Sequence, residues 1–178
     1  MTALDGDILV ITGPPGAGKS TMARALVERL DLAVLLQGDW FFDSVKSGWI
    51  PPWTPESRHQ NTVVTEAMAA AASQFARGGY AVVVEGIVGP WFLDTFVPAV
   101  GDVDVHYVVI RPSEDVAMTR AVAREAPALV DPEPVTKMYK AFEALGPHEH
   151  HVIDTSGHDV ADTVAEVLAR LDAGALRL

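Results

Sequence analysis

One stretch near the N-terminus has the residue types and spacing of a phosphate-binding loop. It matches the pattern G-x-x-x-x-G-K-[ST] at every fixed position and comprises Gly13, Pro14, Pro15, Gly16, Ala17, Gly18, Lys19, Ser20 and Thr21. Glycines let backbone N–H groups turn toward a polyphosphate, and the N-terminus of a following helix adds partial positive charge. Lys19 can reach the β- and γ-phosphates, and the Ser20 hydroxyl can ligate Mg²⁺. We expect this loop to bind ATP with Mg²⁺; a purely structural Gly/Pro-rich turn is the alternative.

Two carboxylates follow apolar runs at positions where they could act on the bound phosphate. Asp39 comes directly after the run at 33–37, where it could accept the proton of an attacking hydroxyl or help to hold the metal. The alternative is an aspartate that only stabilises the turn at Gly38. Glu85 ends the run at 80–85, where it could hold Mg²⁺ through water or hydrogen-bond the acceptor. A strand-end carboxylate that faces solvent is the alternative for Glu85.

Residues in the second half of the chain could complete the nucleotide site. Arg120 and Arg124 are four residues apart on an expected helix, so they share a face. With residues at about 120–134 as a lid, both arginines could contact ATP and stabilise charge during transfer. An ordinary solvated helix face is the alternative. Thr155 and Ser156 follow the last apolar run and could border the adenine ring.

A segment rich in tryptophan and proline, at about 40–56, precedes a long helical pattern. Its prolines and tryptophans do not suit a regular element, so we expect an irregular insertion. Aromatic side chains on the open side of the phosphate loop would suit a ring-containing acceptor, whereas a satellite core beneath a long loop is the alternative. The candidate acceptor contacts are Trp40, Phe41, Trp49, Trp53, Arg58, Glu85 and Trp91.

Apolar runs alternate with helical patterns along the chain, which predicts an α/β fold with a parallel sheet covered on both faces. Ligands bind such sheets at the carboxyl ends of the strands, where the candidate residues lie. The expected strands cover 7–12, 33–37, 80–85, 103–110 and 151–154, and the expected helices cover 21–30, 56–77, 91–96, 113–126, 135–145 and 159–171. No repeat or linker divides the sequence, so we expect one domain over residues 1–178.

Composition narrows the class of protein. The chain has 178 residues, nearly half of them hydrophobic, so a folded domain with a substantial core is expected. The net charge of −11 argues against a nucleic-acid-binding surface, which needs a basic face. The absence of cysteine excludes disulfides and thiolate metal sites. With neither a signal peptide nor a membrane-length apolar stretch in the sequence, we expect a cytoplasmic protein, monomeric or homodimeric.

Together, the phosphate loop, Gly38-Asp39, residues 82–86 and the Arg120/Arg124 segment resemble small P-loop kinases, most closely the chloramphenicol phosphotransferase-like group. That group lies within a wider set that holds shikimate kinase, gluconate kinase and the zeta toxins. The resemblance implies a three-layer P-loop fold with a five-stranded parallel sheet in the order 2-3-1-4-5. It also implies that Asp39 is the base and that the two arginines contact ATP phosphates. Glu85-Gly86 departs from the antibiotic kinase, which has paired aspartates there.

These features predict an ATP- and Mg²⁺-dependent kinase that transfers the γ-phosphoryl group to a hydroxyl of a small molecule, such as an antibiotic or another ring-containing metabolite. A zeta-toxin-like kinase of a nucleotide sugar is a second hypothesis. A nucleotide-binding switch or ATPase module without an acceptor is a third. A GTPase would need an N-K-x-D motif, which the sequence lacks.

Overall fold

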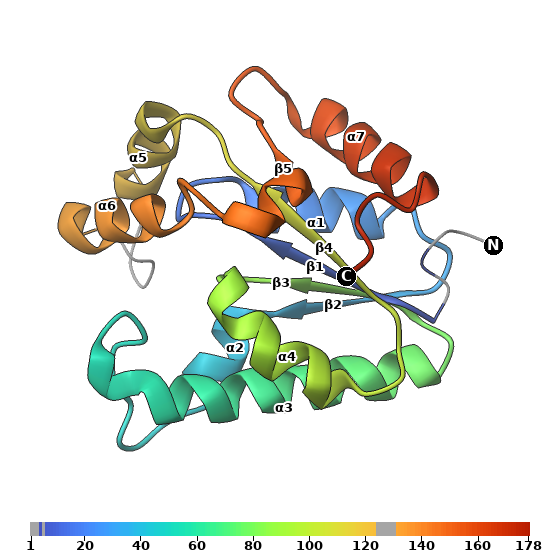
Figure 1. The fold of residues 1–178 in the computed structure, drawn as a ribbon, viewed down its shortest axis with the longest axis horizontal. Coiled ribbons are helices and arrows are strands. Elements are labelled where there is room, and N and C mark those ends of the chain that lie inside the picture. Colours follow the sequence, from blue (N-terminus) through green and yellow to red (C-terminus); the bar gives the residue numbers. More distant parts are fainter. Residues whose placement is uncertain (1–3, 5, 124–130) are drawn as a thin grey trace.

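The computed structural model describes residue 4, residues 6–123 and residues 131–178. At its centre is a five-stranded sheet in the order β2-β3-β1-β4-β5, with every pair of strands parallel (Figure 1). The strands are β1 (Ile8–Thr12), β2 (Ala33–Gln37), β3 (Ala81–Glu85), β4 (Val105–Ile110) and β5 (Val152–Ile153). The predicted fold class and strand order are therefore confirmed.

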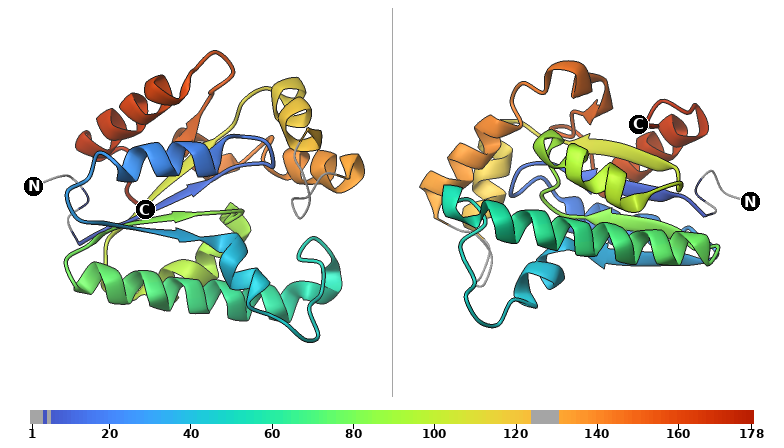
Figure 2. Two further views of the ribbon diagram at one scale, coloured as in Figure 1. Left: turned by 180° about the vertical axis from the view of Figure 1, so that it is seen from behind. Right: turned by 60° about the horizontal axis from the view of Figure 1, so that its bottom comes forward.

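Helices cover both faces of the sheet. Figures 1 and 2 show α1 and α7 on one face, α3 and α4 on the other, and α5 and α6 beyond the carboxyl ends of the strands. None of the helices in the described residues is both long and apolar enough to cross a lipid bilayer. The helices are α1 (Lys19–Val27), α2 (Gly38–Asp43), α3 (Arg58–Arg77), α4 (Leu93–Val100), α5 (Glu114–Val122), α6 (Pro132–Ala141) and α7 (Val160–Asp172).

Alternating residues of the strands fill two separate cores. Val82 and Val84 of β3 face α3 and α4 and join the cluster that contains Phe96, whereas Val83 between them joins the cluster of Leu26 on the α1 and α7 side. Successive strand side chains point to opposite faces, so a strand buried on both sides needs a continuous apolar run. This double burial fixes the strand positions and thereby the loops at their carboxyl ends.

The segment at 40–56 is more regular than its composition suggests. Residues 38–43 form α2, and Pro55–Ser57 form a 3₁₀ turn that leads into α3. The expectation of a wholly irregular insertion is wrong for residues 40–43, because the prolines begin only at Pro51 and cannot oppose a helix that ends at Asp43. Phe41 packs against the core on the α3 side, which stabilises this short helix.

Other boundaries also differ from the sequence expectation; for example, the helix expected to end at 145 ends at Ala141. Pro98 does not end a helix but lies inside α4, because burial of Phe96 and Val100 on one side keeps the backbone helical. The helix expected to start at 135 begins at Pro132, where proline needs no N–H partner and the Asp131 side chain accepts from the Glu133 N–H at 3.2 Å. Residues 124–130 of the expected lid lie outside the described residues.

Two glycines of the phosphate loop lie very close to backbone atoms of neighbouring elements. Gly16 has φ of +78°, and a Cβ at this position would lie 2.0 Å from the Ala117 carbonyl oxygen of α5. A Cβ at Gly13 would lie 2.1 Å from the carbonyl oxygen of Ile110, the last residue of β4. Only glycine permits such an approach, so the loop, α5 and the end of β4 are packed as one unit.

Replacing Gly16 by alanine tests this packing. We expect Gly16→Ala to lower the free energy of unfolding by about 3 kcal/mol or more, because the new Cβ clashes with the Ala117 carbonyl group as well as straining the backbone. Gly18→Ala is the matched control. Gly18 also has positive φ, +92°, but no atom lies within 4 Å of a Cβ there, so only about 1 kcal/mol is expected. Equal losses in chemical denaturation would contradict the close packing.

Candidate active site

Lys19 occupies the centre of the phosphate loop. Gly18 in left-handed conformation caps α1, and Lys19 is the first residue of that helix. The Lys19 ammonium group donates to the carbonyl oxygens of Gly13 at 3.0 Å and Pro14 at 2.9 Å, and only 7% of the residue is exposed. Ser20 follows in the first turn. A buried cation and the positive end of a helix dipole therefore lie at the same place, which is the electrostatic requirement for a polyphosphate.

Glu85 is buried beside the strand that leads into this loop. Residue Glu85 is 4% exposed and pairs in register with Ile11 of β1 on one side and Gln37 of β2 on the other. The Gln37 amide donates to Glu85 Oε1 at 3.0 Å. A strand-end carboxylate that faces solvent is therefore excluded. Gln37 was missed from the sequence, although a polar residue that closes an apolar strand at the ligand edge is a usable signal.

Asp39 lies at the same edge of the sheet, in the exposed first turn of α2. Gly38 before it is packed so closely that a Cβ would lie 3.3 Å from the Glu85 carbonyl oxygen. The end of β2 thus turns into α2 directly against the end of β3. This contact positions the backbone of Asp39 next to the carboxyl end of β3, which pairs with the strand that leads into the phosphate loop.

Thr12 and Tyr107 fix the segment that follows β3. The Val88 N–H donates to Thr12 Oγ1 at 3.0 Å, and the Tyr107 hydroxyl donates to the Val88 carbonyl oxygen at 2.9 Å. Burial raises the pKa of Tyr107, so its hydroxyl stays protonated and remains a donor. Both residues were missed from the sequence; a polar side chain at the end of an otherwise apolar strand, such as Thr12, is the signal that could have found one of them.

The arginine candidates lie on the helix that packs against the phosphate loop. A Cβ at Gly16 would meet the Ala117 carbonyl oxygen and the Ala121 nitrogen, so this side of α5 faces the loop. Arg120, exposed in the last turn of α5, is three residues after Ala117 and adjacent to Ala121, which places it at the flank of that side. Arg124 lies outside the described residues.

Thr155 and Ser156 lie in the turn that follows β5, and their hydroxyl groups differ in hydrogen bonding. The Ser156 hydroxyl donates to Asp154 and accepts from the Ser113 N–H at 2.9 Å. The hydroxyl and the backbone N–H of Ser156 both donate to the Asp154 carboxylate, which lowers the pKa of Asp154 below its usual value. Thr155 Oγ1 is buried and has no hydrogen-bond partner among the described residues. Ser156 therefore links the β5 turn to the start of α5, whereas the Thr155 hydroxyl is not used within the described part of the chain.

The aromatic candidates form two groups rather than one. Trp49 and Trp53 meet edge to face with ring centroids 6.3 Å apart, whereas Trp91 packs on Phe142 at 5.2 Å. The four tryptophans, Trp40 included, are 38 to 59% exposed. A satellite core would bury these rings, so the exposed Trp49–Trp53 pair is better suited to meeting a ligand.

Side chains in the first turn of α3, together with Ser57 just before it, hold the insertion that carries this pair. The Gln60 amide donates to the Ile50 carbonyl oxygen at 2.7 Å and accepts from the Ile50 N–H at 2.8 Å. Asn61 and Ser57 both donate to the Pro52 carbonyl oxygen, at 2.7 and 3.0 Å. The loop therefore holds the two tryptophans in place without a core of its own. Arg58, the first residue of α3, is exposed beside it.

Arg111 anchors α6 to the end of β4. Its guanidinium group donates to the Phe142 carbonyl oxygen at 2.8 Å and pairs with Glu149, lowering the pKa of that carboxyl group below its usual value. The Tyr139 hydroxyl adds a bond to the Pro112 carbonyl oxygen at 2.8 Å. The position of α6 is thus set by the same strand end that supports the phosphate loop.

Comparison with known proteins identifies the family. Residues 8–145 match the AAA domain family, and the chain belongs to it. A cytidylate kinase from Archaeoglobus fulgidus is 26% identical over 157 residues, which cover 88% of this chain and 83% of that protein. Two solved structures share the fold. The tunicamycin resistance protein of Deinococcus radiodurans has a TM-score of 0.70 at 18% identity, covering 93% of this chain and 95% of that one. A gluconokinase from Sinorhizobium meliloti has a TM-score of 0.66 at 21% identity, covering 96% and 94%.

These similarities support a P-loop kinase and nucleotide binding by the phosphate loop. The resemblance to small P-loop kinases stated from the sequence is confirmed. The relatives differ in the molecules that their names mention, so the acceptor has to be inferred from this chain's own residues.

Removing the Arg111 anchor should destabilise the α6 region. We expect Arg111→Met to lower the free energy of unfolding by about 1–3 kcal/mol, because two carbonyl groups just after α6 and the Glu149 carboxylate lose their donor. Arg177→Met is the control, because its pairing with Asp104 is well exposed and worth about 1 kcal/mol or less. Equal midpoints for both variants in urea denaturation would contradict the anchoring role.

Proposed function

We propose that the protein is an ATP- and Mg²⁺-dependent phosphotransferase that transfers the γ-phosphoryl group to a hydroxyl of a small, ring-containing acceptor. The observation that carries the proposal is the position of Asp39. The turn before it packs on the end of β3, so a carboxylate follows the neighbouring strand at the edge where the phosphate loop begins. That is the place for a base acting on an attacking hydroxyl.

The donor side of the site holds the nucleotide. Backbone N–H groups of residues 13–21 cradle the phosphates, the Lys19 cation contacts the β- and γ-phosphates, and Thr155 borders the adenine with the backbone of Ser156. Arg120 and Arg124 stabilise the charge that develops on the transferring group. The support is the loop's glycine geometry, the buried ammonium group of Lys19 and the packing of α5 on Gly16.

Mg²⁺ fits the side chains around this site. The Ser20 hydroxyl and the carboxylates of Asp39 and Glu85 are the oxygen ligands that this ion prefers, and phosphates and water complete its shell. In residues 4, 6–123 and 131–178, no three acidic or histidine side chains lie close enough together to hold a metal ion by themselves. When bound, Mg²⁺ neutralises phosphate charge. Glu85 can also hydrogen-bond the acceptor while Gln37 holds its other oxygen.

The acceptor side is formed by the insertion and its neighbours. Trp49 and Trp53 offer exposed rings on a clamped loop, and Trp40, Phe41, Arg58 and Trp91 complete the set of proposed contacts. Aromatic rings favour stacking with a ring of the acceptor, and a pre-positioned loop lowers the entropy cost of binding. The acceptor's hydroxyl then faces Asp39, which takes its proton as the O–P bond forms and the bond to the β-phosphate oxygen breaks, leaving ADP.

Asparagine at position 39 tests the base. A library of antibiotics, sugars and nucleosides is first screened for an ATP-dependent mass gain of one phosphoryl group. With the best acceptor, Asp39→Asn should lower kcat by about 10²-fold or more, because an amide cannot take the proton, while ATP affinity stays within about twofold. Asp43→Asn, on the last turn of the same helix, is the control and should keep near-normal turnover. Full turnover in Asp39→Asn would refute the assignment.

The similarity to cytidylate kinase favours one other acceptor, the phosphate of a nucleoside monophosphate. A phosphate oxygen is already ionised and needs no base. Rapid transfer to cytidine monophosphate that survives Asp39→Asn would therefore favour this second function over the first.

A further inference from the structure

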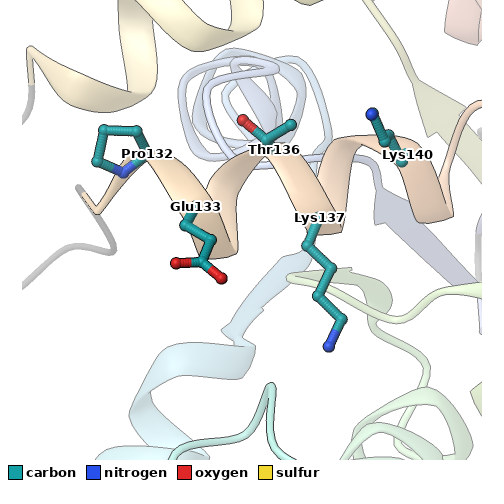
Figure 3. A pocket seen from close by; sticks show the side chains of 5 residues that line it. All are labelled: Pro132, Glu133, Thr136, Lys137 and Lys140. Atoms are coloured by element: carbon teal, nitrogen blue, oxygen red, sulfur yellow. The ribbon is translucent and has the colours of Figure 1, made fainter.

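Lys137 on α6 lies outside the residues that hold ATP in the proposal above. Figure 3 shows a shallow depression on α6 lined by Pro132, Glu133, Thr136, Lys137 and Lys140. In that view Glu133 and Lys137 extend toward α2, while Lys140 points the other way. Because α2 carries Asp39, Lys137 points toward the proposed acceptor side of the site.

The helix is held so that Lys137 keeps this direction. Val135 and Tyr139 are buried, and the Tyr139 hydroxyl is bonded to the Pro112 carbonyl oxygen. Lys137 lies two residues from each of them, which on an α-helix is roughly the opposite side. Arg111 fixes the C-terminal end of α6 at the Phe142 carbonyl oxygen. Lys137 is therefore presented away from α6's buried side by a helix anchored at β4.

Neither the helix dipole nor an ion pair among the described residues accounts for the positive charge of Lys137. Glu133 in the first turn and Lys140 in the last turn both suit the helix dipole, but Lys137 lies in the middle of α6. Within the described residues Lys137 forms no ion pair, although Glu133 is four residues before it. Arg58 likewise has no ion-pair partner among the described residues, and its position at the start of α3 is opposed by the dipole of that helix. Two exposed cations without carboxylate partners thus belong to the elements on either side of the proposed acceptor space.

We propose that the acceptor carries an oxyanion group, a carboxylate or a phosphate, and that Lys137 binds it. This inference rests on the proposed function and adds the charge of the substrate. Asp39 and Glu85 at the reacting end repel an anion, whereas Lys137 attracts it on the far side. The opposed charges orient the acceptor with its hydroxyl toward Asp39, and Arg58 stabilises the same oxyanion from α3. A neutral acceptor gains nothing from Lys137, and a cationic one is repelled.

Pairs of compounds that differ in the presence of an oxyanion group test the inference. Cytidine monophosphate is compared with cytidine for the phosphate, and glucuronate with glucose for the carboxylate. Both binding, by calorimetry, and ATP-dependent transfer are measured. We expect the wild type to favour the anionic member of at least one pair, and Lys137→Ala to lower kcat/KM for that member about tenfold, with KM rising and the affinity for ATP unchanged. Lys140→Ala, whose side chain points away from α2 in Figure 3, should change neither by more than about twofold.

The outcomes separate the two proposals. If an anionic member binds, loses its binding in Lys137→Ala and receives no phosphoryl group on a hydroxyl, the result would support the oxyanion site and contradict the proposed function. Transfer to neutral or cationic acceptors alone would overturn the oxyanion site and leave the proposed function intact. Equal effects of Lys137→Ala and Lys140→Ala, or no binding of any anionic member, would also overturn it.

Discussion

The arrangement of the candidate site depends on close contact between backbone atoms of the phosphate loop and those of α5 and β4. Gly16 of the phosphate loop lies against the carbonyl group of Ala117, and Gly13 lies against that of Ile110, with no space for a side chain at either place. This contact joins the loop that faces the nucleotide to the helix that carries Arg120 and to the strand that ends at Arg111. Through Arg111 the constraint extends to α6, so the proposed donor side and one wall of the proposed acceptor side are positioned by the same strand end.

The other wall of the proposed acceptor side is held by side-chain hydrogen bonds rather than by close backbone packing. The insertion after α2 has no core of its own and is held by amide and hydroxyl groups of α3, chiefly Gln60 at Ile50. Hydrogen bonds of this kind fix the backbone of a loop and place no constraint on the residue types of its outward-facing side chains. The tunicamycin resistance protein and the gluconokinase that share the fold carry names for different small molecules.

The strands of the sheet and the phosphate loop could be predicted from the sequence. Double burial of the strands makes each a continuous apolar run, so β1, β2 and β3 were placed to within a residue at each end. The phosphate loop was clear because its chemistry demands glycine, lysine and serine at fixed spacing. Residues whose meaning depends on long-range contacts were not predictable in this way. Gln37 matters because β2 pairs with β3 in one register, and Gln60 because a loop ten residues earlier folds back on it. The helix at 38–43 was not predicted, because the tryptophan- and proline-rich composition of residues 40–56 indicated irregular structure. In the fold, the packing of Phe41 against the core stabilises this helix.

The central claim is that the phosphoryl group of ATP ends on a small molecule rather than on water. The most direct measurement is the balance of products in one reaction with the preferred acceptor: ADP, phosphorylated acceptor and free phosphate. The account predicts that phosphorylated acceptor matches ADP one for one, with little free phosphate. Formation of ADP matched by free phosphate, with every acceptor tested left unmodified, would contradict it and favour an ATPase or a nucleotide-dependent switch.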